Sequence, residues 1–194
     1  QTFELDIANM ESVEQLINNN EKNFKSLKGI ICTAGMIHAE DNVDNDKKKI
    51  QSLIFTNFSS ISFLISKVTD LIDLTGKISV IGFGSVSGLL GRKHNAYYAA
   101  SKRALSSFFE SLSFSKKSEN LNIQFYILGY LDTNLAFGKN LTLPKGSTKK
   151  LATKVYKYRN DKFRTIYYPH MWFYISFILK VIPFFLLRII SKII

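Results

Sequence analysis

Residues 78–102 read ISVIGFGSVSGLLGRKHNAYYAASK, and this stretch decides the fold class. Residues 78–83 form a continuous apolar run, which is typical of a strand that is buried on both faces. A turn rich in glycine and serine follows, and the sequence then predicts a long helix over 96–117. A buried strand that leads into a long helix is the building unit of a parallel sheet covered by helices.

The same alternation continues on both sides of this stretch. Before this stretch we predict a strand at 3–7, a helix at 10–26, a strand at 28–33 and a helix at 47–74, which ends before Gly76. After it we predict a strand at 122–128, a helix that begins after a cap at Ser147 and runs to 158, and a strand at 163–168, which ends before Pro169. Strands that are apolar throughout must be covered on both faces. The sequence therefore predicts an α/β fold with a parallel sheet in a three-layer α/β/α arrangement.

The composition is that of one globular domain. The chain has 194 residues, 46% of them apolar, and its single cysteine, Cys32, allows neither an internal disulfide nor a metal cluster. We expect Cys32 to pack as a small apolar residue, in a reducing compartment such as the cytoplasm. The chain opens at Gln1 with no signal peptide, and a start other than Met leads us to expect that the natural beginning is missing.

The formal net charge of +11 leaves several kinds of partner open. A basic chain suits nucleic acid, an anionic membrane surface or an anionic ligand, but plain over-use of lysine produces the same charge. The basic residues are scattered and form no stripe of arginines and aromatics. We therefore expect no nucleic-acid binding.

Tyr98 and Lys102 are spaced to lie on one face of the predicted helix. A lysine ammonium beside a tyrosine favours the phenolate, so the pair can pass a proton to and from a carbonyl oxygen. Such a pair alone is weak evidence, because Tyr158 and Lys162 repeat the spacing in a polar stretch without supporting neighbours. Ser85 distinguishes the first pair, since a hydroxyl at the end of a buried strand can hold the substrate oxygen against the tyrosine.

The segments GSVSG at 84–88 and YAASK at 98–102 resemble the catalytic stretch of the short-chain dehydrogenases/reductases. Four further segments match that family in the same order along the chain. Leu5-Asp6-Ile7 resembles the strand end whose aspartate contacts the adenine, and Cys32–Gly35 resembles the family's Asn-Asn-Ala-Gly turn. Thr56-Asn57 resembles the site of its catalytic asparagine, and Leu128–Thr133 resembles its Pro-Gly loop. The resemblance implies a Rossmann-like, doubly wound parallel sheet. It also implies that the first β-α-β unit, with the glycine-rich phosphate loop, is lacking here, and hence weak cofactor binding.

The resemblance implies a role for each matched residue. Tyr98 is the general acid and base, Lys102 lowers its pKa and binds the nicotinamide ribose, Ser85 orients the substrate, and Asn57 holds a water of the proton relay. The cofactor is NAD or NADP, no metal is involved, and the implied cofactor-binding residues are Asp6, Ile7, Ala34, Gly35, Tyr98, Lys102, Leu128, Gly129, Leu131 and Thr133. Cys32 and Thr33 replace two asparagines of the family, and Leu128 replaces a proline.

The C-terminal residues 170–194 read as an apolar helical tail on a catalytic domain of residues 1–169. Lys180, Pro183, Arg188 and Lys192 interrupt the apolar run, so we expect two short helices meeting near Pro183 rather than a membrane span. These helices suit a membrane interface, but packing against the core or against a partner copy explains the composition equally well.

The segments at 92–95 and 166–169 and the apolar tail resemble a bacterial subgroup that includes the decaprenylphosphoryl-ribose keto-reductase. That subgroup implies a lipid-linked sugar ketone and a place on the inner membrane face, in cell-envelope polysaccharide synthesis. A membrane-associated steroid or 3-ketosphinganine reductase is the alternative, and a catalytically silent partner subunit is an alternative of another class. The family resemblance also implies homo-oligomers through the helices at 47–74 and 96–117.

Overall fold

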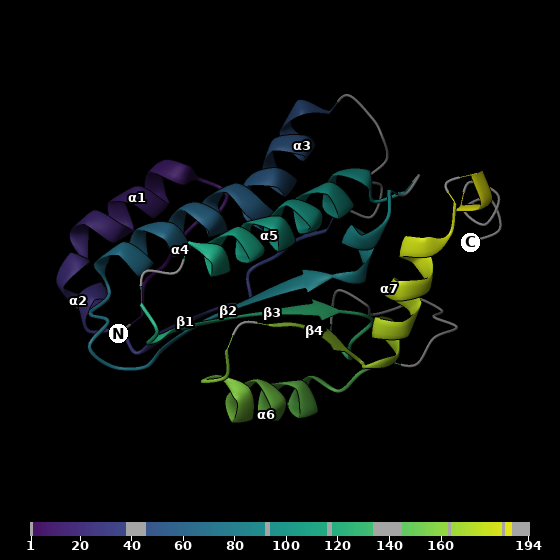
Figure 1. The fold of residues 1–194 in the computed structure, drawn as a ribbon. Coiled ribbons are helices and arrows are strands. Elements are labelled where there is room, and N and C mark those ends of the chain that lie inside the picture. The colour runs from purple at the N-terminus through teal and green to yellow at the C-terminus, as the bar shows by residue number, and fades with distance from the viewer. Residues whose placement is uncertain are drawn as a thin grey trace.

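A four-stranded parallel sheet forms the centre of the molecule in a computed structural model that describes residues 2–37, 46–91, 94–115, 118–133, 145–162, 164–183 and 185–187. The strands are β1 (Gly29–Cys32), β2 (Ile78–Ser85), β3 (Leu121–Leu128) and β4 (Arg164–Tyr168). They lie side by side in chain order, and each neighbouring pair is parallel (Figure 1). The carboxyl ends of all four strands therefore meet at one edge of the sheet.

Helices cover both faces of the sheet, which confirms the predicted three-layer α/β/α arrangement. One face carries α1 (Met10–Asn19), α2 (Glu21–Lys25), α3 (Lys47–Ile54), α4 (Ser60–Leu71) and α5 (Ala96–Phe114), while α6 (Thr148–Tyr158) lies on the other (Figure 1). A π-helical segment, η1 (Phe55–Ser59), joins α3 to α4, and a 3-10 turn, η2 (Val86–Leu89), follows β2. The side chain of Ser147 accepts a hydrogen bond from the Lys150 N–H, so the predicted cap of α6 is present.

Aromatic packing sets the height of α5 above β2 and β3. The rings of Phe109 on α5 and Phe125 on β3 lie 4.9 Å apart between centroids, and both side chains are buried. A Cβ on Gly82 of β2 would lie 2.2 Å from the Phe109 ring, so only glycine leaves room for this ring over the strand. Because Tyr98 and Lys102 belong to the same helix, this packing also fixes where they stand relative to the end of β2.

Several predicted elements differ in detail from those observed. Residues 3–7 form no strand, because they pair with none of the strands in the described part of the chain. The predicted helix at 10–26 breaks at Asn20, whose side chain donates to the Leu16 carbonyl and closes α1. The predicted helix at 47–74 ends at Leu71, since Ile72 turns to an extended conformation and enters the core. The helix predicted over 96–117 ends at Phe114.

The C-terminal region forms α7 (Met171–Val181), which lies beside the carboxyl ends of β3 and β4 (Figure 1). A helical turn over 185–187 follows Pro183, whose carbonyl accepts two hydrogen bonds from that turn. The predicted break near Pro183 is therefore present, whereas residues 188–194 lie outside the described residues. Within the part of the chain that the structure describes, no helix has the length and apolar character needed to cross a bilayer.

The two faces of α7 differ in their burial. Trp172 and Ser176 are buried against the domain. The opposite face and the following turn expose large apolar side chains, namely Phe173, Tyr174, Phe177, Ile178, Val181, Phe185 and Leu186. We refer to these seven residues as the outer face of the tail. One side of α7 thus packs against the domain, and among the described residues nothing covers the other side.

Candidate active site

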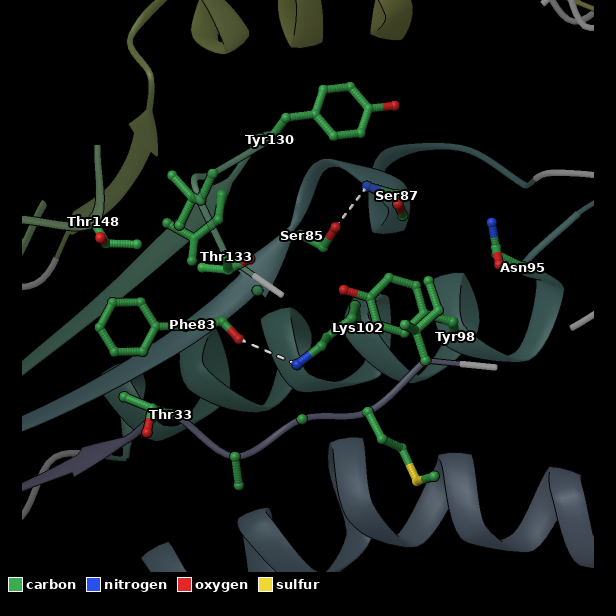
Figure 2. Close-up of a pocket in the computed structure, with 18 of the residues that line it drawn as sticks. Thr33, Phe83, Ser85, Ser87, Asn95, Tyr98, Lys102, Tyr130, Thr133 and Thr148 are labelled. Atoms are coloured by element: carbon green, nitrogen blue, oxygen red, sulfur yellow. Dashed lines mark hydrogen bonds between the residues drawn. The ribbon is translucent and has the colours of Figure 1, made fainter. Parts of the chain in front are cut away.

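A cavity of about 460 Å³ opens at the carboxyl ends of β1, β2 and β3, where parallel α/β sheets bind their ligands (Figure 2). Its walls come from the segments after β1, β2 and β3 and from the starts of α5 and α6. The lining residues are Thr33, Ala34, Gly35, Met36, Ile37, Phe83, Gly84, Ser85, Ser87, Asn95, Tyr98, Lys102, Leu128, Gly129, Tyr130, Leu131, Thr133, Thr148 and Leu151.

Ser85 and Tyr98 stand at the same wall of this cavity (Figure 2). Ser85 is the last residue of β2, and its hydroxyl accepts a hydrogen bond of 3.1 Å from the Ser87 N–H. Burial raises the pKa of the Tyr98 phenol, and a side-chain hydrogen bond with Ser85 partly opposes this rise. The serine that sequence spacing singled out is therefore in direct contact with the tyrosine.

Lys102 lies one helical turn after Tyr98, and its side chain is inserted beneath the cavity with 6% of the residue exposed. Its ammonium nitrogen is 5.9 Å from the centre of the Tyr98 ring and donates a long hydrogen bond of 3.5 Å to the Phe83 carbonyl. Burial lowers the pKa of Lys102 to about 8, and the nearby Cys32 opposes this slightly. The largest influence on the pKa of Tyr98 is thus burial, not the Lys102 charge that the sequence suggested.

Asn57 is wholly buried within the π-helical segment η1. Its side-chain amide donates to the Met36 carbonyl at 2.9 Å and accepts from the Met36 N–H at 2.9 Å, so it holds the segment after β1 in place. A Cβ on Gly35 would lie 3.4 Å from Asn57 Oδ1 and 3.1 Å from Lys102 Nζ. The side chains of Asn57 and Lys102 therefore both approach Gly35. Asn57 belongs to a π-helical segment, and such segments are often found at functional sites.

The predicted cofactor-binding residues divide into two groups. Ala34, Gly35, Leu128, Gly129, Leu131 and Thr133 line the cavity together with Tyr98 and Lys102. Asp6 and Ile7 do not line it. The Asp6 carboxylate accepts a hydrogen bond of 2.9 Å from the Ala8 N–H in an exposed turn, and Ile7 packs against the hydrophobic core.

The cavity suits the nicotinamide end of a dinucleotide. Ala34, Phe83 and Leu131 offer apolar walls to a flat ring, while the buried Lys102 ammonium and the Thr133 hydroxyl can meet ribose and carboxamide groups. Gly35 leaves open the space that a Cβ would fill between Lys102 and Asn57. The described residues contain no cluster of histidine, cysteine or carboxylates that could bind a metal ion.

Sequence reasoning missed several residues of this cavity. Ser87, Asn95 and Tyr130 bring polar groups to its walls (Figure 2). Asn95 has a φ of 60°, in the left-handed region that asparagine tolerates better than most residues. An asparagine directly before a predicted helix was the available signal for Asn95, whereas Tyr130 lies within the matched segment Leu128–Thr133, where the resemblance gave this position no role.

The second tyrosine–lysine pair lies elsewhere. Tyr158 is at the end of α6, on the opposite face of the sheet from α5, where its carbonyl accepts a hydrogen bond from Gln124. Neither Tyr158 nor Lys162 lines the cavity. The structure therefore separates the two pairs as the neighbouring residues in the sequence predicted.

Comparisons with known proteins agree with this geometry. The family model described as short chain dehydrogenase matches residues 1–143. The chain is 27% identical over 147 residues to "Short-chain dehydrogenase srdE" of Neurospora crassa, covering 75% of this chain and 50% of that protein. It is 29% identical over 134 residues to "3-oxoacyl-[acyl-carrier-protein] reductase FabG" of Buchnera aphidicola, covering 68% of this chain and 54% of the relative.

A third relative is "Hydroxysteroid 11-beta-dehydrogenase 1-like protein A" of Xenopus laevis, which is 30% identical over 140 residues, or 70% of this chain and 45% of the relative. The chain spans about half the length of the curated relatives it matches. A solved structure of 4-hydroxyisoleucine dehydrogenase complexed with NADH superimposes with a TM-score of 0.69 at 19% identity, covering 85% of this chain and 78% of that one. On the family match over more than half of its length, the chain belongs to the short-chain dehydrogenase family.

Proposed function

We propose that the protein carrying this chain interconverts a ketone and a secondary alcohol with NAD or NADP as hydride carrier. The observation that supports this most is the convergence of four side chains from three elements. Ser85, Tyr98 and Lys102 line one cavity, and Asn57 is buried directly behind it, beside Gly35. A buried lysine is costly for a fold, and such residues often occur where chemistry uses them.

Each of the four residues has a proposed task in the reaction. In the reducing direction, the bound dinucleotide supplies a hydride to the carbonyl carbon. Tyr98 donates its phenolic proton to the carbonyl oxygen, which becomes the alcohol, and in oxidation the phenolate takes the proton back. Ser85 donates a hydrogen bond to the same oxygen and holds it beside Tyr98.

Lys102 and Asn57 have supporting tasks in the proposed proton transfer. With a pKa of about 8, Lys102 is mostly charged at neutral pH, so its ammonium stabilises the Tyr98 phenolate and can donate to ribose hydroxyls. Asn57 fixes the Met36 backbone and, in the proposed relay, holds a water beside Lys102. Asp6 and Ile7 are proposed to contact the adenine end of the dinucleotide, outside the cavity described above.

For the substrate, we favour a ketone carried on a lipid, such as a lipid-linked sugar of the cell envelope. The outer face of the tail supports this choice, because α7 lies at the same edge of the sheet as the cavity (Figure 1). Residues 162–194 also contain five lysines and arginines and no acidic residue, which suits an anionic bilayer surface. In this proposal residues 1–169 carry the chemistry and residues 170–194 contact the membrane from the cytoplasmic side.

A steroid or 3-ketosphinganine reductase is the second candidate, favoured by the likeness to the Xenopus protein. Its substrate is apolar as well, so the same tail would serve it. Self-association through α4 and α5 is part of either proposal and is supported by the family resemblance.

The reaction is tested by following the absorbance of NADH and NADPH with a panel of polyprenyl-phosphosugar, steroid and sphingoid ketones. Tyr98→Phe is expected to lower turnover about a hundredfold or more, because it removes the proton donor. Tyr158→Phe is the matched control, since it alters the other tyrosine–lysine pair and is expected to keep wild-type turnover. Failure of the whole protein that carries this chain on every ketone would favour the silent partner subunit, and an active Tyr98→Phe variant would refute the mechanism.

Membrane contact is tested separately by flotation with vesicles of neutral or anionic lipid. The double variant Phe177→Asp/Val181→Asp places charge on the outer face of the tail and is expected to abolish flotation with anionic vesicles. Tyr156→Asp alters an equally exposed aromatic residue on α6 and serves as the control. Equal flotation of both variants would contradict the membrane assignment while leaving the reaction assignment intact.

A further inference from the structure

The turn that follows β3 rests on the indole of Trp172. Gly129 begins this turn, and a Cβ built on it would lie 1.9 Å from Trp172 Nε1 and 2.4 Å from Cδ1. The rings of Tyr130 and Trp172 also meet edge to face, with their centroids 6.0 Å apart. Trp172 comes from the first turn of α7 and is only 8% exposed, so the indole fills the space behind the turn.

Backbone hydrogen bonds hold the same turn on its other sides. The Gly129 N–H donates to the Tyr168 carbonyl at 2.8 Å, which ties the turn to the end of β4. Further along, Gly146 donates to the Tyr130 carbonyl at 2.8 Å and accepts from the Asp132 N–H at 3.1 Å. Three backbone hydrogen bonds therefore attach the turn over 129–133 to Tyr168 and Gly146. Its contact with α7 is the packing against Trp172.

A hydrogen bond does not account for the position of the Trp172 indole. Trp172 Nε1 is buried and has no partner among the described residues. A buried donor without a partner is unfavourable, so shape and contact with Gly129 and Tyr130 account for the position of this side chain. Tryptophan is suited to that task because it is the largest rigid side chain.

We infer that Trp172 is a positioning residue, which sets the distance between the 129–133 turn and the reacting groups of Tyr98 and Lys102. The inference rests on the proposed function, because Gly129, Leu131 and Thr133 of this turn face the cavity in which the nicotinamide would lie. Trp172 does not line the cavity itself and therefore acts through the turn. The match to the family model ends at residue 143, before Trp172, and the sequence alone marks Trp172 only as part of an apolar tail.

The first test measures the dissociation constants of NADH and NADPH by titrating the fluorescence of the reduced nicotinamide, with no substrate present. Trp172→Ala is expected to weaken binding of the preferred cofactor about tenfold, since the turn loses its support. Trp172→Phe keeps an aromatic ring and is expected to recover most of the affinity lost in the alanine variant. Ile72→Ala removes a buried residue at the far end of α4 and controls for lost stability alone.

The second test uses Gly129→Ala and does not depend on Trp172→Ala folding. In the wild-type background the added methyl group must displace the indole or the turn, and we expect the dissociation constant to rise about fivefold. In the Trp172→Phe background the clashing five-membered ring is gone, and we expect a rise of less than about twofold. This coupling distinguishes a positioning contact from general destabilisation.

The outcomes separate the inference from the proposed function. Equal effects of Gly129→Ala in both backgrounds, or Trp172→Ala binding cofactor as well as Ile72→Ala does, would overturn the role of Trp172 while the reaction could stand. If the whole protein that carries this chain binds neither NADH nor NADPH, both the inference and the proposed function are overturned. Tenfold weakening by Trp172→Ala together with the expected coupling supports the inference even if the substrate of the enzyme differs from the one proposed.

Discussion

Replacing Lys102 with methionine should make the protein more stable at neutral pH, and this advantage should shrink as the pH rises. Lys102 is almost completely buried, and burial lowers its pKa from 10.5 to about 8. A tenfold change in an equilibrium corresponds to about 1.4 kcal/mol, so at pH 7 the charged lysine costs the fold about 3 kcal/mol. Methionine has a similar length and carries no charge, so it removes this cost.

The pH dependence follows from the sign of the shift. The pKa of Lys102 is lower in the folded protein, so between about pH 8 and pH 10.5 the unfolded chain binds more protons. The stability of the wild type must then increase with pH relative to the variant. Integrating between pH 7 and pH 10 gives an expected change of about 2 to 3 kcal/mol in the difference between the two proteins.

Urea denaturation of the wild type and of Lys102→Met at pH 7, 8, 9 and 10 measures this difference directly. Lys67→Met, which changes an exposed lysine of α4, controls for the loss of one positive charge without burial. A difference between wild type and Lys102→Met that stays constant over this range would refute the claim that Lys102 is held in a poorly solvated position. Loss of turnover in the same variant would show that a residue costly to the fold is retained for the reaction.

Three further predictions concern the surroundings of the same site. Asn57→Ala should lower the free energy of unfolding by about 2 kcal/mol, because the backbone N–H and carbonyl of the half-buried Met36 lose their partner, and chemical denaturation measures this. Ser85→Ala removes a hydrogen bond that lowers the pKa of Tyr98, so the alkaline limb of the pH–rate profile should move to higher pH; an unchanged limb would contradict the contact. Gly35→Ala places a methyl group 3.1 Å from the ammonium of the buried lysine and should raise the KM for cofactor several-fold, with less effect on the KM for the ketone.

Much of the fold follows from local sequence patterns. Apolar runs at 28–33, 78–83 and 122–128 mark strands, and the helices between them mark parallel connections. The expected cover on both faces is present for β2 and β3, whereas β1 lies at the edge of the sheet and leaves Ile31 60% exposed. The helix boundaries were less predictable. The apolar pattern of 47–74 is continuous across the π-helical segment, because one extra residue in a turn shifts the pattern too little to be seen in one sequence. Residues 3–7 look like a strand, but a strand exists only where a neighbour pairs with it.

The sequence by itself determined that the four candidate catalytic residues meet at one site. The order of Asn57, Ser85, Tyr98 and Lys102 along alternating strands and helices brings them to one edge of a parallel sheet, since all strands of such a sheet end on the same side. It also distinguished this tyrosine–lysine pair from Tyr158 and Lys162, which lie outside the cavity.

Only the tertiary structure decided how the site is charged and what supports it. The pKa of Lys102 falls and that of Tyr98 rises because neighbouring segments exclude water from both, and the extent of that exclusion depends on packing between distant parts of the chain. The contact between Trp172 and Gly129 likewise joins residues 43 positions apart, through a helix that a linear pattern describes only as apolar. Local periodicity reports which side of an element is apolar, whereas solvent access and close contacts arise only once the elements are packed together.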